Sequence, residues 1–156
     1  MSQLVWNDQL LREAAERLRR SGGYWGTFRK VEHLMGWLFE QGKCVYCCTD
    51  LITNRNQATT DHLLPWSKYQ DLDKHALNAV PSCTYCNQLK GGWDPNSDGS
   101  QLYTEGGLNT EIRLELLRRA RVYIDGKRKT EKSIIDDLTA WTKALEECRV
   151  KSHTEN

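Results

Sequence analysis

Four of the six cysteines in this 156-residue chain form two Cys-x-x-Cys pairs. Cys44 and Cys47 form the first pair, and Cys83 and Cys86 form the second. Four thiolates on two such corners are the ligands of a tetrahedral structural zinc ion. An intracellular compartment keeps thiols reduced, so the spacing favours zinc over disulfide bonds. Because four cysteines close the coordination sphere, we expect this zinc to support the fold and other residues to carry any chemistry.

The cysteines also have plainer interpretations. Buried apolar cysteines are the alternative to a zinc site, but that alternative does not predict two pairs at this spacing. Cys48 adjoins the first pair and could replace Cys47 as a ligand. Cys148 fits the apolar face of a C-terminal helix. Neither Cys48 nor Cys148 is expected to be catalytic.

Polar residues that could perform hydrolysis lie between the cysteine pairs and directly after them. His62 could act as a general base, because a neutral imidazole with a pKa of about 6.5 accepts a proton from water at cellular pH. The Asp61 carboxylate and the Asn87 amide oxygen are hard ligands suited to a magnesium-type ion. Neighbours on a regular strand point to opposite faces, so Asp61 and His62 can serve one phosphate only where the strand ends or kinks. Pro65 follows shortly and fits such an end.

Two further positions complete this set. Asn87 and Lys90 are three residues apart on an expected helix, so they share a face and Lys90 is a candidate phosphate clamp. Asn78 is expected to bridge backbone groups across the loop before it, a structural role within the site.

The residue runs 61–65 (DHLLP) and 78–91 (NAVPSCTYCNQLKG) resemble the HNH nuclease family, and the resemblance covers residues 44–91. It implies a ββα-metal core in which His62 is the general base and Asn78 holds the loop. Asn87 matches the third motif position, and Asp61 and Asn87 would bind a catalytic Mg²⁺ or Mn²⁺ ion. The resemblance also implies an endonuclease that hydrolyses phosphodiester bonds of nucleic acid, with DNA the favoured substrate.

These residues have structural alternatives. A histidine beside an aspartate is more often a surface or capping pair than a catalytic one, but its place between two cysteine pairs favours catalysis. The other histidines, His33, His75 and His153, are expected to be ordinary solvated residues. Trp66 and Trp93 could stack on bases, although packing against a small core is the favoured interpretation.

The apolar spacing predicts the elements that must position these residues. Helices are expected over residues 8–20 and 27–40, strands over 58–64 and 77–80, and a helix over 83–90 that ends at Gly91-Gly92. Two C-terminal helices are expected, one over residues 110–124 ending at Gly126 and one after Thr130. The predicted fold is α+β, a single domain with N-terminal helices (1–42), a zinc-bound ββα-metal core (43–92), and a loop and helical hairpin (93–156).

Two features of the C-terminal region suggest partners. Apolar residues alternate at steps of four and three from Ile134 to Cys148 and predict a helical neighbour, in a partner subunit or a homo-oligomer. The densest basic stretch is a candidate grip on nucleic acid, with a solvated helix end as the alternative. Its members are Arg118, Arg119, Arg121, Lys127, Arg128 and Lys129.

Composition restricts the function classes further. The 22 Lys and Arg residues against 21 Asp and Glu give a net charge of +1, so any attraction to nucleic acid must come from local patches. No run approaches the roughly 18 apolar residues of a membrane span, and we expect a cytoplasmic protein. The rival functions are a non-catalytic zinc module that binds nucleic acid or protein, and an adaptor built on the C-terminal helix. The biological setting, restriction or phage defence among others, stays open.

Overall fold

The computed structural model describes residues 5–105 and 107–154, with side chains described as far as residue 145. Helix α1 (Asp8–Arg20) begins where Asn7 caps it, its side chain accepting a hydrogen bond from the Leu10 amide at 2.9 Å. A one-turn helix α2 (Gly23–Gly26) follows, and then α3 (Val31–Phe39). The first predicted helix is therefore confirmed. The second begins four residues later than predicted, because α2 and an extended Lys30 precede it.

The central module is a two-stranded antiparallel hairpin covered by a short helix. Strand β1 (Ala58–His62) pairs with β2 (Ala79–Cys83), in a register that places His62 opposite Ala79. Helix α4 (Thr84–Lys90) follows directly and contacts both strands. Short 3₁₀ turns, η1 (Arg55–Gln57) and η2 (Gln70–Leu72), precede and follow β1. The predicted order of strand, loop, strand and helix is confirmed within a mixed α/β fold.

Helix α3 packs unusually close to β2, because Gly36 lies at the contact. A Cβ atom added at Gly36 would collide with the carbonyl oxygen of Ala79, the residue that pairs with His62. Leu34, Met35 and Trp37 on the same helix are buried in the core. The glycine therefore fixes how near α3 comes to the end of β1.

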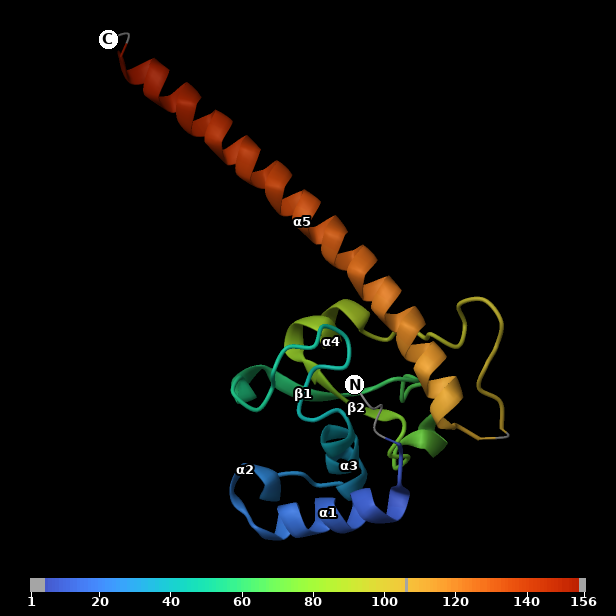
Figure 1. Cartoon of the computed structure of the whole chain (residues 1–156). Helices are drawn as coiled ribbons and strands as arrows, with labels where there is room; N and C mark the ends of the chain where they lie inside the picture. Colours follow the sequence, from blue (N-terminus) through green and yellow to red (C-terminus); the bar gives the residue numbers. More distant parts are fainter. Residues whose placement is uncertain (1–4, 106, 155–156) are drawn as a thin grey trace.

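The C-terminal part of the chain is one continuous helix, α5 (Thr110–Thr154), which extends away from the body of the molecule (Figure 1). The predicted helical hairpin of residues 93–156 is wrong. Gly126 does not end the helix, because a glycine in a helix interior is less favourable than alanine by only about 1 kcal/mol and its neighbours are good helix formers. One face of the helix is buried as far as Ile124. From Glu131 to Trp141 all of its side chains are exposed.

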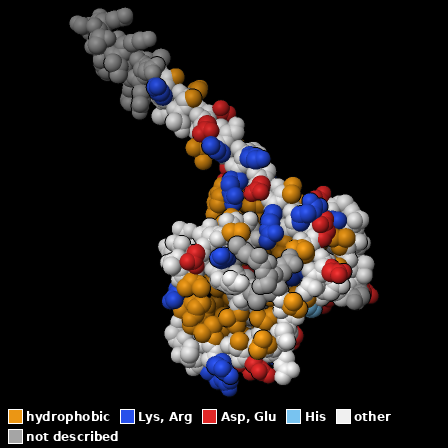
Figure 2. Space-filling model, viewed as in Figure 1, with side chains coloured by type: hydrophobic (Ala, Val, Ile, Leu, Met, Phe, Trp, Pro, Cys, Tyr) orange, Lys and Arg blue, Asp and Glu red, His pale blue; other side chains and the backbone are white. Residues whose placement is uncertain are grey.

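The distal half of α5 mixes apolar, basic and acidic side chains along one isolated rod (Figure 2). Ile134 is 53% exposed and Trp141 69% exposed, and Leu138 and Leu145 are exposed between and after them. The predicted apolar stripe is thus present as far as Leu145, and no other described part of the chain covers it. Cys148, the last residue of the predicted stripe, lies outside the described side chains.

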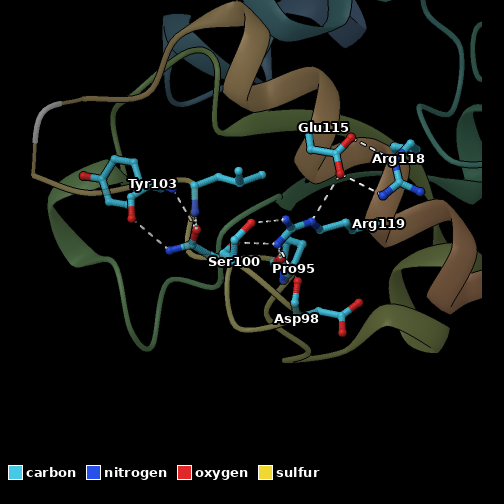
Figure 3. A network of polar contacts seen from close by, with 9 residues as sticks. Pro95, Asp98, Ser100, Tyr103, Glu115, Arg118 and Arg119 are labelled. Carbon is cyan, nitrogen blue, oxygen red and sulfur yellow. Dashed lines mark hydrogen bonds and ion pairs between the residues drawn. The ribbon is translucent and has the colours of Figure 1, made fainter.

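The loop before α5 is held in place by Arg119 and Asn96. The buried guanidinium of Arg119 donates hydrogen bonds to the carbonyl oxygens of Pro95, Asp98 and Ser100 (Figure 3). Asn96 holds the other end of the loop, its amide donating to the Tyr103 carbonyl at 3.0 Å. The connection therefore packs against the first turns of α5. Within the described residues, no helix is both long enough and apolar enough to cross a membrane.

Candidate metal centre and active site

The side chains of the four paired cysteines meet between the turn that carries Cys44 and Cys47 and the start of α4. The sulfur atoms of Cys44, Cys47, Cys83 and Cys86 lie within 4.8 Å of one another. The Sγ atoms of Cys47 and Cys83 are 3.8 Å apart. A tetrahedral zinc with Zn–S bonds of about 2.3 Å has S–S edges of about 3.8 Å. The cluster could therefore hold a metal such as zinc, whereas Cys48 is exposed and lies outside the cluster.

Protons and charge are shared unequally among these thiols. A hydrogen bond from Cys86 lowers the pKa of the Cys44 thiol to about 4, and the same bond raises the pKa of Cys86. Burial raises the pKa of Cys83. Metal ions bind the thiolate form of cysteine, so the lowered pKa of Cys44 favours binding of a cation.

Helix α5 supports the cysteine cluster from outside. The Arg128 guanidinium lies 3.2 Å from the Cys86 sulfur, and Arg121 donates to the carbonyl oxygen of Val45 at 2.8 Å. Val45 in turn donates from its amide to Pro81 on β2 at 2.9 Å. Residues of the predicted nucleic-acid grip therefore have structural contacts, as does the buried Arg119. Lys127, over the Tyr123 ring, and Lys129 remain exposed.

Asp61 lies on the hairpin side that faces α4. Its Oδ2 atom accepts a hydrogen bond from the Tyr46 hydroxyl at 2.6 Å and lies 3.2 Å from the Lys90 ammonium. Both contacts use Oδ2, and in the part of the chain that is described Oδ1 has no protein partner. Lys90 is 2% exposed and also donates to the His62 carbonyl at 2.9 Å. Its ammonium is therefore held beneath the hairpin, instead of at the surface position expected of a phosphate clamp.

Asn87 lies on α4, one turn before Lys90. Its side chain is half-buried, and it makes no hydrogen bond within the described residues. Its amide oxygen is consequently available to a ligand, as is Oδ1 of Asp61. These residues are the two oxygen donors predicted for a catalytic ion, although Asp61 also binds Tyr46 and Lys90 through its other oxygen.

His62 is the last residue of β1. Its ring lies near different residues from those that contact the Asp61 side chain. Its Nε2 atom lies 3.5 Å from Oδ1 of Asp73, which also accepts a hydrogen bond from the Lys30 ammonium at 2.5 Å. That hydrogen bond lowers the pKa of the Asp73 carboxyl. Nε2 makes no hydrogen bond to this carboxylate or to any other described residue, so Asp73 acts on the ring through its charge.

The structure adds His33, which the sequence treated as a solvated residue. Its ring packs edge-on against the His62 ring with centroids 5.8 Å apart, and its Nε2 atom is buried. Burial lowers the pKa of His33, and His62 and Lys30 lower it further. The interpretation as an ordinary solvated histidine is therefore wrong. The sequence signal was its position three residues before Gly36, on the face of α3 that approaches the hairpin.

Asn78 makes the bridge across the loop that its type predicts. Its side chain accepts a hydrogen bond from the Leu64 amide at 2.7 Å and donates to the Leu64 carbonyl at 3.1 Å. Its backbone carbonyl accepts from the Leu63 amide at 2.9 Å. A fully buried amide with these contacts fixes the chain immediately after His62.

The two loop tryptophans differ. Trp93 stacks on Tyr123 of α5, with ring centroids 4.2 Å apart, so its predicted packing role is confirmed. Trp66 is 54% exposed, so it does not have the packing role favoured for it. It follows the Asn78-braced segment directly.

Neither models of known protein families nor curated proteins match this chain. The site therefore has to be interpreted from its own geometry. That geometry places the cysteine cluster, the Asp61–Lys90 pair and the His62–Asp73 pair around one short hairpin.

Proposed function

We propose that this chain is a metal-dependent endonuclease of the HNH type that hydrolyses phosphodiester bonds of nucleic acid, with DNA as its substrate. One observation carries the proposal. His62 ends β1 with a carboxylate facing one ring nitrogen, while uncommitted oxygen donors lie on the preceding residue and on α4. A general base and a pair of hard ligands are the components that hydrolysis by activated water requires.

In the proposed reaction, Nδ1 of His62 takes a proton from a water molecule that attacks the phosphorus atom. The nearby Asp73 carboxylate would stabilise the imidazolium that forms, and Lys30 keeps Asp73 ionised. Asp61 and Asn87 would hold a Mg²⁺ or Mn²⁺ ion, which supplies stabilisation of the leaving oxyanion. Lys90 balances the charge of Asp61 and fixes the carbonyl of His62. A zinc ion at the four cysteines would join the turn that carries Cys44 and Cys47 to α4.

A second candidate is a non-catalytic zinc module that binds nucleic acid or protein. It is favoured by the burial of Asp61 against Tyr46 and Lys90, since such a pair can serve stability alone. Cleavage separates the two candidates, because the module would bind without hydrolysing.

The test is a cleavage panel of duplex DNA, single-stranded DNA and RNA with Mg²⁺ or Mn²⁺, run beside His62→Ala. Wild-type protein should cleave DNA, and His62→Ala should lose a factor of about 10² to 10⁴ in rate, the usual contribution of a general base. Lys143→Ala is the control, because Lys143 is exposed on the distal half of α5 and should leave the rate unchanged. Equal rates for wild type and His62→Ala would refute the assignment.

A further inference from the structure

A groove of about 350 Å³ runs along β1 toward His62. One wall is the segment from Tyr24 to Lys30 with the start of α3, and the other is residues 58–60 of β1. His33 lies in the wall of the groove, and its ring packs on that of His62. The groove therefore leads to the proposed base.

The lining combines two kinds of side chain. Tyr24 and Phe28 are half-buried aromatic residues, with ring centroids 5.8 Å apart. Arg29 and Lys30 are the cations of the lining, and the Lys30 ammonium is paired with the Asp73 carboxylate. Arg55 adds a third cation, its guanidinium 5.1 Å from the centre of the Tyr24 ring. The protein as a whole carries a net charge of only +1, so these cations give the groove a local positive field.

The backbone at this place is also open. β1 pairs with β2 along one edge, and in the described sheet it has no partner along the other. Aromatic faces beside cations, next to an open strand edge, are the features that bind single-stranded nucleic acid by stacking bases and neutralising phosphates. The α5 cations lack this combination, because Arg119, Arg121 and Arg128 are committed to structural contacts.

We propose that this groove binds an unpaired stretch of the nucleic acid, with bases stacked on Tyr24 and Phe28 and phosphates at Arg29 and Arg55. The strand then continues to His62, so the preferred substrate has single-stranded or locally unpaired nucleotides beside the scissile phosphate. This last step rests on the proposed nuclease function, whereas binding in the groove does not.

Binding is measured by fluorescence anisotropy with a labelled oligothymidine of roughly 16 nucleotides, without added divalent ion, so that cleavage plays no part. The double variant Arg29→Gln, Arg55→Gln should flatten the slope of log affinity against log salt by about 1.4 units, since each phosphate contact on a single strand contributes about 0.7. Between about 50 and 200 mM salt, the wild type should then lose about sevenfold more affinity than the variant. The control double variant Lys132→Gln, Lys143→Gln removes the same charge from exposed positions on α5 outside the basic stretch and should keep the wild-type slope.

A second readout locates the strand directly. Ultraviolet crosslinking to bromouracil oligonucleotide, followed by trypsin and mass spectrometry, should label the peptide of residues 21–29, which contains Tyr24 and Phe28. Three results would each overturn the proposal that the groove binds nucleic acid. They are equal slopes in both double variants, labelling confined to α5 peptides, and no binding of the oligothymidine. Binding with these signatures but no cleavage under any metal condition would refute the nuclease function and leave the groove standing.

Discussion

The ammonium of Lys90 lies 3.2 Å from the carboxylate of Asp61, with both side chains almost fully buried between the hairpin and α4. Arg118 and Glu115 form a pair at 2.7 Å, but their side chains are 62% and 37% exposed. Ion pairs in such different surroundings should have different energetic consequences. A buried charge that loses its partner cannot be rescued by water, whereas an exposed one can.

Replacing Lys90 with methionine should therefore lower the free energy of unfolding by about 3 to 5 kcal/mol, because the Asp61 carboxylate is left buried beside Tyr46 without a cation. Arg118→Met, in the exposed pair, should lower it by no more than about 1 kcal/mol. Urea denaturation of the zinc-loaded protein measures both. Equal losses in the two variants would contradict the idea that burial makes the Lys90 pair important.

The local elements were largely predictable, because short-range chemistry determines them. Asn7 caps α1, and the second cysteine pair begins α4 just before Gly91 ends it. The cysteine cluster also followed from spacing, since two Cys-x-x-Cys pairs form a metal site only if the chain brings them together. These features depend on neighbours along the chain or on one strong constraint.

What the sequence did not predict depends on long-range packing. The contact of His33 with His62 depends on Gly36, which lets α3 approach Ala79, and a glycine alone does not indicate which segment it will contact. Asp73 facing His62 depends likewise on how the loop folds back. The predicted helix end at Gly126 was wrong, because a helix can continue through one glycine when the neighbouring residues favour it.

Gly36→Ala should lower the free energy of unfolding by about 1 to 3 kcal/mol or more, because the new methyl group meets the rigid carbonyl of Ala79 and α3 must move away. Gly126→Ala is the matched control. A Cβ at Gly126 meets no atom, and the substitution should raise the stability of α5 by up to about 1 kcal/mol. Thermal denaturation followed by circular dichroism distinguishes them, and a Gly36→Ala protein as stable as wild type would show that the contact is not tight.

We predict one zinc per chain, measured by elemental analysis, and complete loss of binding together with unfolding in Cys83→Ser. Arg128→Gln should weaken zinc binding by about 10- to 100-fold, because the guanidinium at Cys86 supports a charged sulfur ligand. Competition with a chromogenic chelator measures the affinity. Lys127→Gln, one residue earlier on α5 and directed at the Tyr123 ring, should bind zinc as wild type does. If both variants bind equally, Arg128 does not act on the cluster.

The apolar stripe of α5 should pair with a second copy of this chain, because its steps of four and three match a coiled-coil seam and nothing in the described structure covers it. Light scattering should give a dimer or higher assembly for wild type and a monomer for Leu138→Glu. Lys143→Glu, on a polar position of the same helix, should leave the assembly intact. A monomeric wild-type protein would contradict this expectation.

Stability should fall as the pH decreases through about 6.5, in a way that depends on His33. Burial lowers the pKa of His33 in the folded protein, so below its ordinary value of about 6.5 the unfolded chain binds more protons than the folded one. The stabilising contribution is present above that pH and is lost as pH falls through it. Asp73, with its pKa lowered by Lys30, acts only below about pH 4 and does not affect this range. His33→Gln should therefore show a flatter dependence of urea midpoint on pH than wild type, with zinc content checked at each pH. Parallel curves for the two proteins would mean that His33 takes up its proton as easily beside His62 as it does in water.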